Sequence, residues 1–190
     1  MKTKTVGLLG GSFDPAHAGH VNITKAAIKR FDLDEVWWLV SPRNPLKTAS
    51  HASYSTRLVL ASKIMQHPRV RVTDIERRIG TNYTADTLST LTHILPRTQF
   101  VWLMGADNLD QFDNWKQWER IMHTLPVGIL ARPGNRLAPL NARAARIYRA
   151  CRVPMHQSQL LAKGRPPRWC YINLPMSRLS SSSLRSEDAP

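Results

Sequence analysis

Short apolar segments alternate with segments of helical periodicity along this chain of 190 residues. Each apolar segment is rich in Val, Leu, Ile or Trp and is bounded by Gly, Pro or polar residues, a pattern typical of buried strands. The expected strands lie at residues 5–10, 36–40, 70–73, 100–104, 127–130 and 169–172. Residues 70–73 alternate apolar and polar positions, so we expect this strand to be half exposed.

The segments between the strands place apolar residues three and four positions apart, as amphipathic helices do. Helices are expected at residues 23–31, 53–65, 85–95, 115–121 and 139–150, with a loop at 157–167. Ser53 is placed to cap the second helix, whose buried stripe should hold Leu58, Ala61, Ile64 and Met65. Strands that alternate with helices predict parallel βαβ units. The expected fold is therefore α/β and Rossmann-like: one domain, residues 1–190, built on an open parallel sheet with helices on both faces.

Charge narrows the classes of partner. The 27 Lys and Arg residues outnumber the 13 Asp and Glu residues, which gives a formal charge of +14, and positions 120–186 hold no acidic residue. So basic a chain favours an anionic partner: nucleic acid, an acidic lipid surface or a polyphosphate metabolite. One basic row on an expected helix has its residues three positions apart: Arg143, Arg146, Arg149 and Arg152. Such a row is most simply a solvated helix face, but it could also contact a neighbouring subunit or bind nucleic acid nonspecifically.

Composition excludes several other classes. Hydrophobic residues make up 42% and charged residues 21% of the chain, as in globular proteins rather than disordered ones. No apolar run approaches the ~20 residues that span a bilayer, and the N-terminal apolar stretch is too short for a signal peptide. Cys151 and Cys170 lack the spacing of a disulfide framework or a zinc site. We therefore expect a cytoplasmic protein.

The turn after the first expected strand holds the most informative motif, GGSFDPAHAGH at residues 10–20. Gly10 and Gly11 permit close approach of the backbone to a ligand, and amides at the start of the next helix can receive phosphate oxygens. His17 and His20 are three residues apart, so both imidazoles can face one phosphoryl group. The structural alternative is a glycine turn with two surface histidines that cap a helix. The combined motif favours phosphate binding.

This motif resembles the GG[ST]FDPxHxGH signature of the bacterial nicotinate-nucleotide adenylyltransferases, which belong to the HxGH nucleotidyltransferases. Further segments match in family order: SPRNPLK at 41–47, NYTADTL at 82–88, MGADNLDQFDNWKQW at 104–118, ARPG at 131–134 and LSSSSLR at 179–185. The last resembles the family's ISSTxIR, and it keeps a hydroxyl at Ser182 and the guanidinium at Arg185. The resemblance spans nearly the whole chain.

The resemblance implies transfer of AMP from ATP to nicotinate mononucleotide, giving deamido-NAD and pyrophosphate in NAD biosynthesis. Such a reaction needs position and charge neutralisation rather than a nucleophilic side chain. Mg²⁺ would bridge the phosphate oxygens and be carried mainly by substrate and water, so no protein-only metal cage is expected. The implied partners are ATP and the mononucleotide, with no specific nucleic acid and no membrane. A homo-oligomer stays open.

The resemblance also implies a set of site residues. Catalytic roles fall to His17, His20 and Arg185. The implied ATP site consists of Gly10, Gly11, Ser12, Phe13, His17, His20, Gly105, Asp107, Ser181, Ser182 and Arg185. Trp115 would stack on the pyridine ring and Thr84 would help to hold its carboxylate, while Lys47 and Arg132, each just after an expected strand, would be further contacts of the mononucleotide.

Alternatives remain at two levels. Phe112, Trp115 and Trp118 have the near-helical spacing of core aromatics, and we favour the core for Trp118. Related enzymes accept nicotinamide mononucleotide or phosphopantetheine as the acceptor. The enzymes that use phosphopantetheine usually carry Thr where this chain has His17. A basic nucleic-acid-binding module is the alternative of another class, and it leaves the HxGH and SSSSLR segments unexplained.

Overall fold

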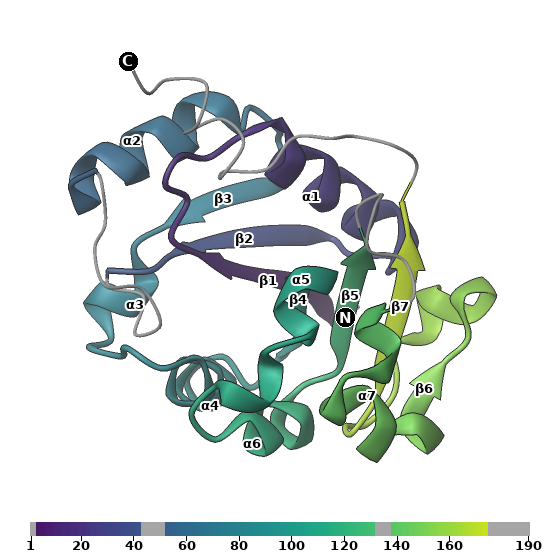
Figure 1. Ribbon diagram of the computed structural model, residues 1–190. Helices are drawn as coiled ribbons and strands as arrows, with labels where there is room; N and C mark the ends of the chain where they lie inside the picture. Colours follow the sequence, from purple (N-terminus) through teal and green to yellow (C-terminus); the bar gives the residue numbers. More distant parts are fainter. Residues whose placement is uncertain (1–2, 43–51, 132–137, 175–190) are drawn as a thin grey trace.

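The predicted α/β architecture is confirmed in the computed structural model, which describes residues 3–42, 52–131 and 138–174. The strands of this part of the chain form one parallel sheet in the order β3-β2-β1-β4-β5-β7-β6 (Figure 1). Their bounds are β1 (Lys4–Gly11), β2 (Glu35–Val40), β3 (Val70–Thr73), β4 (Thr98–Gly105), β5 (Val127–Ala131), β6 (Arg152–Val153) and β7 (Trp169–Asn173). Each expected strand is present, and β6 is an additional short strand at the edge.

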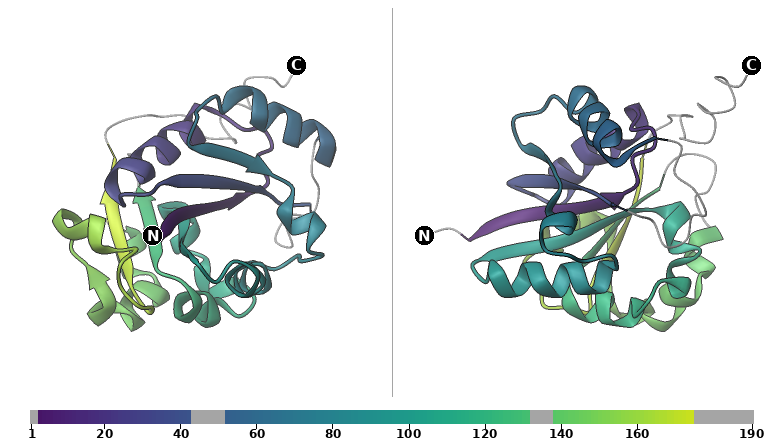
Figure 2. Two further views of the ribbon diagram at one scale, coloured as in Figure 1. Left: turned by 180° about the vertical axis from the view of Figure 1, so that it is seen from behind. Right: turned by 90° about the vertical axis from the view of Figure 1, so that its left-hand side faces the viewer.

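Helices cover both faces of this sheet. Helices α1 and α2 lie on one face, while α4, α6 and α7 lie on the other (Figures 1 and 2). The helices are α1 (Ala18–Arg30), α2 (Tyr54–Ile64), α3 (Ile75–Arg78), α4 (Thr84–Ile94), α5 (Ala106–Leu109), α6 (Trp118–Thr124) and α7 (Arg143–Ile147). Short 3-10 turns are η1 (Phe112–Asn114), η2 (Ala138–Asn141), η3 (Arg149–Cys151) and η4 (Met155–Leu160).

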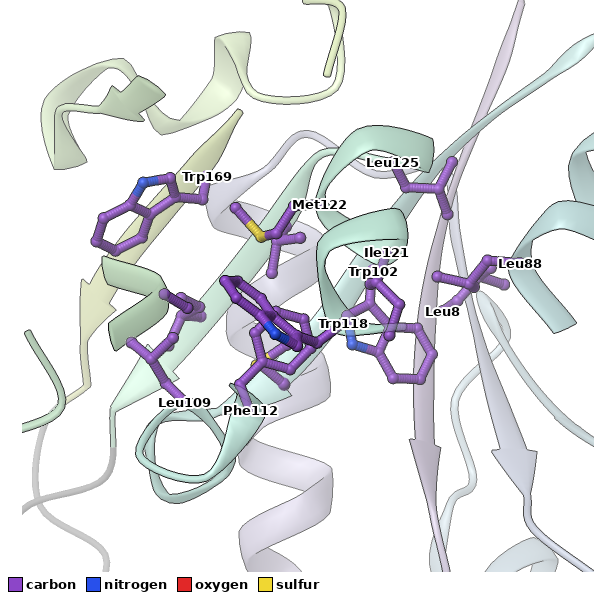
Figure 3. Packing of buried hydrophobic residues seen from close by; sticks show 14 of the residues in the cluster. Leu8, Leu88, Trp102, Leu109, Phe112, Trp118, Ile121, Met122, Leu125 and Trp169 are labelled. Atoms are coloured by element: carbon purple, nitrogen blue, oxygen red, sulfur yellow. The ribbon is translucent and has the colours of Figure 1, made fainter. Parts of the chain in front are cut away.

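The continuous apolar runs are explained by burial on both faces of the sheet. In β4, Phe100, Trp102 and Met104 pack with α4 and α6, whereas Val101 and Leu103 pack on the opposite side with α1. Figure 3 shows the first of these cores, in which Trp102, Phe112 and Trp118 pack together with the aliphatic side chains of α6. An alternating pattern would have left one face of the sheet in water.

The strand order indicates where this sheet is expected to bind a ligand. From β1 the chain runs outward through β2 to β3, whereas β4 pairs with the other side of β1 and leads to β5. The carboxyl ends of β1 and β4 therefore flank the point where the strand order reverses. Open parallel sheets bind their ligands at such a point.

Three local predictions are corrected. The helix expected at 139–150 is broken into η2, α7 and η3, because the chain must turn at Tyr148 to bring β6 beside β7. The helix expected at 115–121 begins only at Trp118, since Gln117 adopts a left-handed conformation with φ 55°. Ser53 does cap α2, but Ile64 is 38% exposed, and Arg57 takes a place on the buried face of the helix.

Among the described residues, no helix is long and apolar enough to cross a membrane.

Cys151 and Cys170 are both free thiols, and burial raises the pKa of the Cys170 thiol to about 11.

Candidate active site

The glycine turn at the end of β1 lies over buried aromatic rings. A side chain on Gly10 would collide with the ring of Trp102 in β4, so only glycine fits there. Phe13 follows with φ 48°, a left-handed conformation that costs a bulky residue about 1–3 kcal/mol. Its ring stacks on Trp38, with centroids 4.6 Å apart and an angle of 14° between the planes. This contact helps to hold the turn, and the 2% exposure of Phe13 leaves mainly its backbone for a ligand.

His17 and His20 form a reciprocal cap at the start of α1. The Nδ1 atom of His17 accepts a hydrogen bond from the amide of Gly19 at 3.0 Å, while the amide of His17 donates to Nδ1 of His20 at 3.2 Å. The two ring centroids are 4.0 Å apart. Because each Nδ1 accepts a hydrogen bond, it carries no proton, and the proton of each ring is on Nε2. The cap thus sets the tautomer of both imidazoles.

A buried network fixes the position of His20. The hydroxyl of Thr24, one turn further along α1, donates to the carbonyl of His20 at 2.8 Å and accepts from the indole Nε1 of Trp38 at 2.7 Å. The His20 ring also contacts the rings of Phe13 and Trp38, with centroids 5.0 Å and 6.0 Å away. Trp38 of β2 therefore helps to hold His20 in place, both through Thr24 and by direct contact with its ring.

Arg57 is a functional candidate that the sequence reasoning missed. This residue of α2 is only 3% exposed, yet its guanidinium reaches two turns at the carboxyl edge of the sheet. It donates to the carbonyl of Ser12 after β1, to that of Ser41 after β2 at 2.9 Å, and to that of Pro42 at 3.2 Å. A single buried cation thus ties the glycine turn to the neighbouring loop. Isolated arginines on a helix give no signal of such a role in sequence.

Glu76 is a second residue that was missed. Its carboxylate, 5% exposed as a residue, accepts hydrogen bonds from the Ser41 hydroxyl at 2.8 Å and from the Thr87 hydroxyl at 3.3 Å. Burial raises the pKa of Glu76 above its ordinary value, and these two hydrogen bonds oppose the rise. Ser41 is therefore held at its carbonyl by Arg57 and at its hydroxyl by Glu76.

A second group of expected site residues surrounds Trp115. Its ring meets Trp102 and Phe112 edge to face, with centroids 6.3 Å and 5.4 Å apart, and the side chain is half-buried. Lys116 lies over the ring of Tyr83, 4.1 Å from its centroid, so this segment lies beside Thr84 at the first turn of α4. The indole of Trp102 contacts both Trp115 and the Gly10 backbone, and so connects this group to the glycine turn.

The other two aromatics of this segment belong to the core. Phe112 is fully buried and Trp118 is 8% exposed, which confirms the core position expected for Trp118. At the end of β4, a side chain on Gly105 would collide with the carboxylate of Asp107, and Asp107 itself is exposed.

Several expected site residues lie outside the described part of the chain: Lys47, Arg132, Ser181, Ser182 and Arg185. Within the described ranges, no group of three or more His, Cys, Asp or Glu side chains could hold a metal ion. The residues at the glycine turn offer hydrogen-bond donors rather than a set of metal ligands.

Comparison with known proteins gives a consistent result. Residues 8–187 match the model of the family described as cytidylyltransferase-like. A protein of Ruegeria sp. (strain TM1040) is 56% identical over 185 residues, which cover 97% of this chain and 98% of that protein. One of Brucella suis biovar 1 is 43% identical over 182 residues, covering 95% and 94%. Both carry the name probable nicotinate-nucleotide adenylyltransferase.

Solved structures share the fold. The nicotinic acid mononucleotide adenylyltransferase of Plasmodium falciparum complexed with NaAD superimposes with a TM-score of 0.72 at 18% identity. The same protein complexed with APC gives a TM-score of 0.70. In both cases the match covers 96% of this chain and 83% of the other. At this level of identity the likeness concerns the fold.

Proposed function

This chain belongs to the nicotinate-nucleotide adenylyltransferases of the cytidylyltransferase-like family, and we propose that it transfers AMP from ATP to nicotinate mononucleotide. The products are deamido-NAD and pyrophosphate, and the reaction is a step of NAD biosynthesis. The observation that carries the proposal is the histidine pair, which caps α1 beside the glycine turn at the reversal point of the sheet. We assign the reaction to one domain that acts in the cytoplasm.

The histidine pair suits adenylyl transfer because it holds two Nε2–H donors in fixed orientations beside the glycine turn; His20 is half-buried, whereas His17 is only 2% exposed. A phosphate oxygen of the mononucleotide attacks the α-phosphorus of ATP, the bond to the bridging oxygen breaks, and pyrophosphate leaves with the electron pair. The negative charge on the phosphoryl oxygens requires donors that are already in position. In our proposal the Nε2–H groups of His17 and His20 supply them, with His20 nearer to the α-phosphoryl group.

The ATP site extends over both strand ends. We propose that the backbone of Gly10, Gly11, Ser12 and Phe13 borders the phosphates, with Gly105 and Asp107 at the end of β4. Ser181, Ser182 and Arg185 would hold the polyphosphate from the C-terminal segment, with Arg185 in a catalytic role. Mg²⁺ would reach the site with ATP, bound to phosphate oxygens and water, and it would neutralise phosphate charge.

The acceptor site is proposed around Trp115, whose half-buried indole would stack on the pyridine ring. Thr84 begins α4, an 11-residue helix whose N-terminal amides favour a carboxylate. A neutral carboxamide gains less from these amides, which is the physical basis for selecting nicotinate. Lys47 and Arg132 are proposed as further contacts of the mononucleotide.

The test is to measure pyrophosphate release from ATP and Mg²⁺ with each acceptor supplied separately: nicotinate mononucleotide, nicotinamide mononucleotide and phosphopantetheine. We expect nicotinate mononucleotide to react much faster than the other two. Equal rates with the two pyridine acceptors would contradict the selection by Thr84 and the α4 amides. Activity with phosphopantetheine alone would contradict the proposed acceptor altogether.

A further inference from the structure

Three arginines of the basic row Arg143, Arg146, Arg149 and Arg152 line a cavity that contains none of the described residues of the proposed active site. Arg146 of α7, Arg149 of η3 and Arg152 of β6 line one cavity of about 230 Å³ together with Trp169 of β7. We propose that this cavity is a binding site for a small phosphate or polyphosphate anion, separate from the glycine turn.

The convergence of the arginines depends on the broken helix. In a continuous α-helix, residues spaced by three are rotated by about 60° at each step, so Arg143 and Arg152 would point to opposite sides. Here α7 ends at Ile147, and the chain turns through η3 into β6. This turn brings Arg152 to the same cavity as Arg146 and Arg149, whereas Arg143 does not line it.

Electrostatics favours an anion in the cavity. Within the described ranges, the ion pairs between side chains involve Lys4, Arg71, Arg78 and Arg120, and none involves the three cavity arginines. The three cavity arginines, all of them exposed, therefore bring like charges to the lining of one small volume, and the described residues supply no carboxylate that forms an ion pair with them. Guanidinium forks match the oxygens of phosphate, and a shared anion would relieve the repulsion between them.

The aromatic side chains of the site argue for a small anion rather than a nucleobase. Arg152 lies over the rings of Trp169 and Tyr171, 5.3 Å and 5.9 Å from their centroids, so it occupies ring surface on which a base would stack. Trp169 is 2% exposed, and its Nε1 donates to the carbonyl of Tyr148 at 2.7 Å. The volume is also below the ~300–1,000 Å³ of ordinary small-molecule pockets.

The position of the cavity separates it from the proposed active site. Arg152 and Trp169 are paired first residues of β6 and β7, at the amino ends of the strands and at one side of the sheet (Figure 1). The glycine turn lies at the carboxyl end of β1, near the middle of the sheet. An anion bound at the arginines would therefore not be a substrate phosphate at the glycine turn.

The test uses inorganic tripolyphosphate and nuclear magnetic resonance of the arginine Nε–H groups, each assigned from its single Arg→Gln variant. Signals of Arg146, Arg149 and Arg152 should shift and saturate with a common dissociation constant. Tripolyphosphate also binds at the active site, and these three signals report binding at the cavity separately. Arg149→Gln should weaken this binding by about tenfold, the effect of losing one charge-assisted hydrogen bond. Arg143→Gln removes the same charge from outside the cavity and should change the constant by less than about twofold.

Other outcomes would overturn the proposal. Equal shifts at Arg143, or shifts that do not saturate, would show only the general positive field of the chain. Equal weakening by Arg143→Gln and Arg149→Gln would lead to the same conclusion. If an oligonucleotide saturated these signals and tripolyphosphate did not, the surface would be a nucleic-acid contact. Circular dichroism of each variant verifies that the fold is retained.

Discussion

Replacement of the buried guanidinium of Arg57 should weaken both the fold and the reaction. Arg57→Met keeps most of the length of the side chain but removes the donors for the carbonyls of Ser12, Ser41 and Pro42. Those carbonyls form parts of the two turns next to the proposed phosphate site. Loss of the donors would let the glycine turn move relative to the loop after β2.

The expected cost follows from opposing contributions. Each hydrogen bond from a charged donor contributes ~1.5–3 kcal/mol, and three are lost. Removing the cation also removes its burial penalty, which is several kcal/mol, and water can reach some of the exposed carbonyls. We expect a net loss of about 2–4 kcal/mol in the free energy of unfolding. Arg57→Lys retains the charge and one or two of the bonds, so its loss should be smaller.

Urea denaturation and steady-state kinetics test this prediction on the same preparations. Because a displacement of about 1 Å can cost ~10²-fold in rate, kcat of Arg57→Met should fall by ~10–10²-fold, with partial rescue in Arg57→Lys. Arg77→Met is the matched control. Arg77 lies 5.6 Å from the Tyr54 ring centroid, as Arg57 does at 5.5 Å, but it is exposed, so its replacement should change stability by less than about 0.5 kcal/mol. Equal stability and kcat in Arg57→Met and Arg77→Met would refute the role of Arg57.

Three further predictions concern single side chains. Trp115→Ala should raise KM for the mononucleotide far more than KM for ATP, at a stability cost of only about 1–2 kcal/mol because the ring is half-buried; a large loss of stability with unchanged KM would place the ring in the core. Glu76→Gln should gain stability relative to the wild type as pH rises above 4.5, because burial raises the folded-state pKa of Glu76 and ionisation then costs the wild type stability. In urea titrations from about pH 4 to about pH 8, the free energy of unfolding of the variant minus that of the wild type should increase with pH, and a constant difference would contradict this. His17→Asn should retain the cap of α1 yet lose ~10²–10³-fold in kcat, whereas His17→Ala should lose the same rate and also about 1 kcal/mol of stability. Near-normal kcat in His17→Asn would assign His17 to the cap alone.

The strands and the glycine turn could be predicted from sequence because their signals are local. Residues 36–40 and 100–104 are apolar without interruption, as strands buried on both faces must be, and Ser53 stands directly before its helix. The same holds for the HxGH turn, where glycines and histidines are neighbours along the chain. Each of these features depends on residues that are close to one another in the sequence.

The remaining features depend on contacts between distant residues. Arg57 reaches the Ser12 carbonyl over 45 positions, and Glu76 reaches Ser41 over 35, so helical periodicity gives no sign of either contact. Arg57 lies on the buried face of α2, where the sequence predicted only apolar side chains, while Ile64 of the predicted stripe is exposed. Likewise α7 ends early so that the chain can turn and bring β6 beside β7. Because β6 has only two residues, it is too short to leave a pattern in the sequence.

The histidine pair shows why capping and phosphate binding need not be competing explanations of the HxGH turn. The cap uses Nδ1 of each ring, and adenylyl transfer as proposed uses Nε2–H, so one side chain serves both purposes with different atoms. Moreover, the cap is what puts the proton on Nε2, since a ring nitrogen that accepts an amide hydrogen bond is unprotonated. A reaction that depends on donors held in place before the substrate arrives gains directly from this coupling, because no reorganisation is needed in the transition state. A substitution can separate the two roles only if it keeps an acceptor at the position of Nδ1 and removes the donor beyond it.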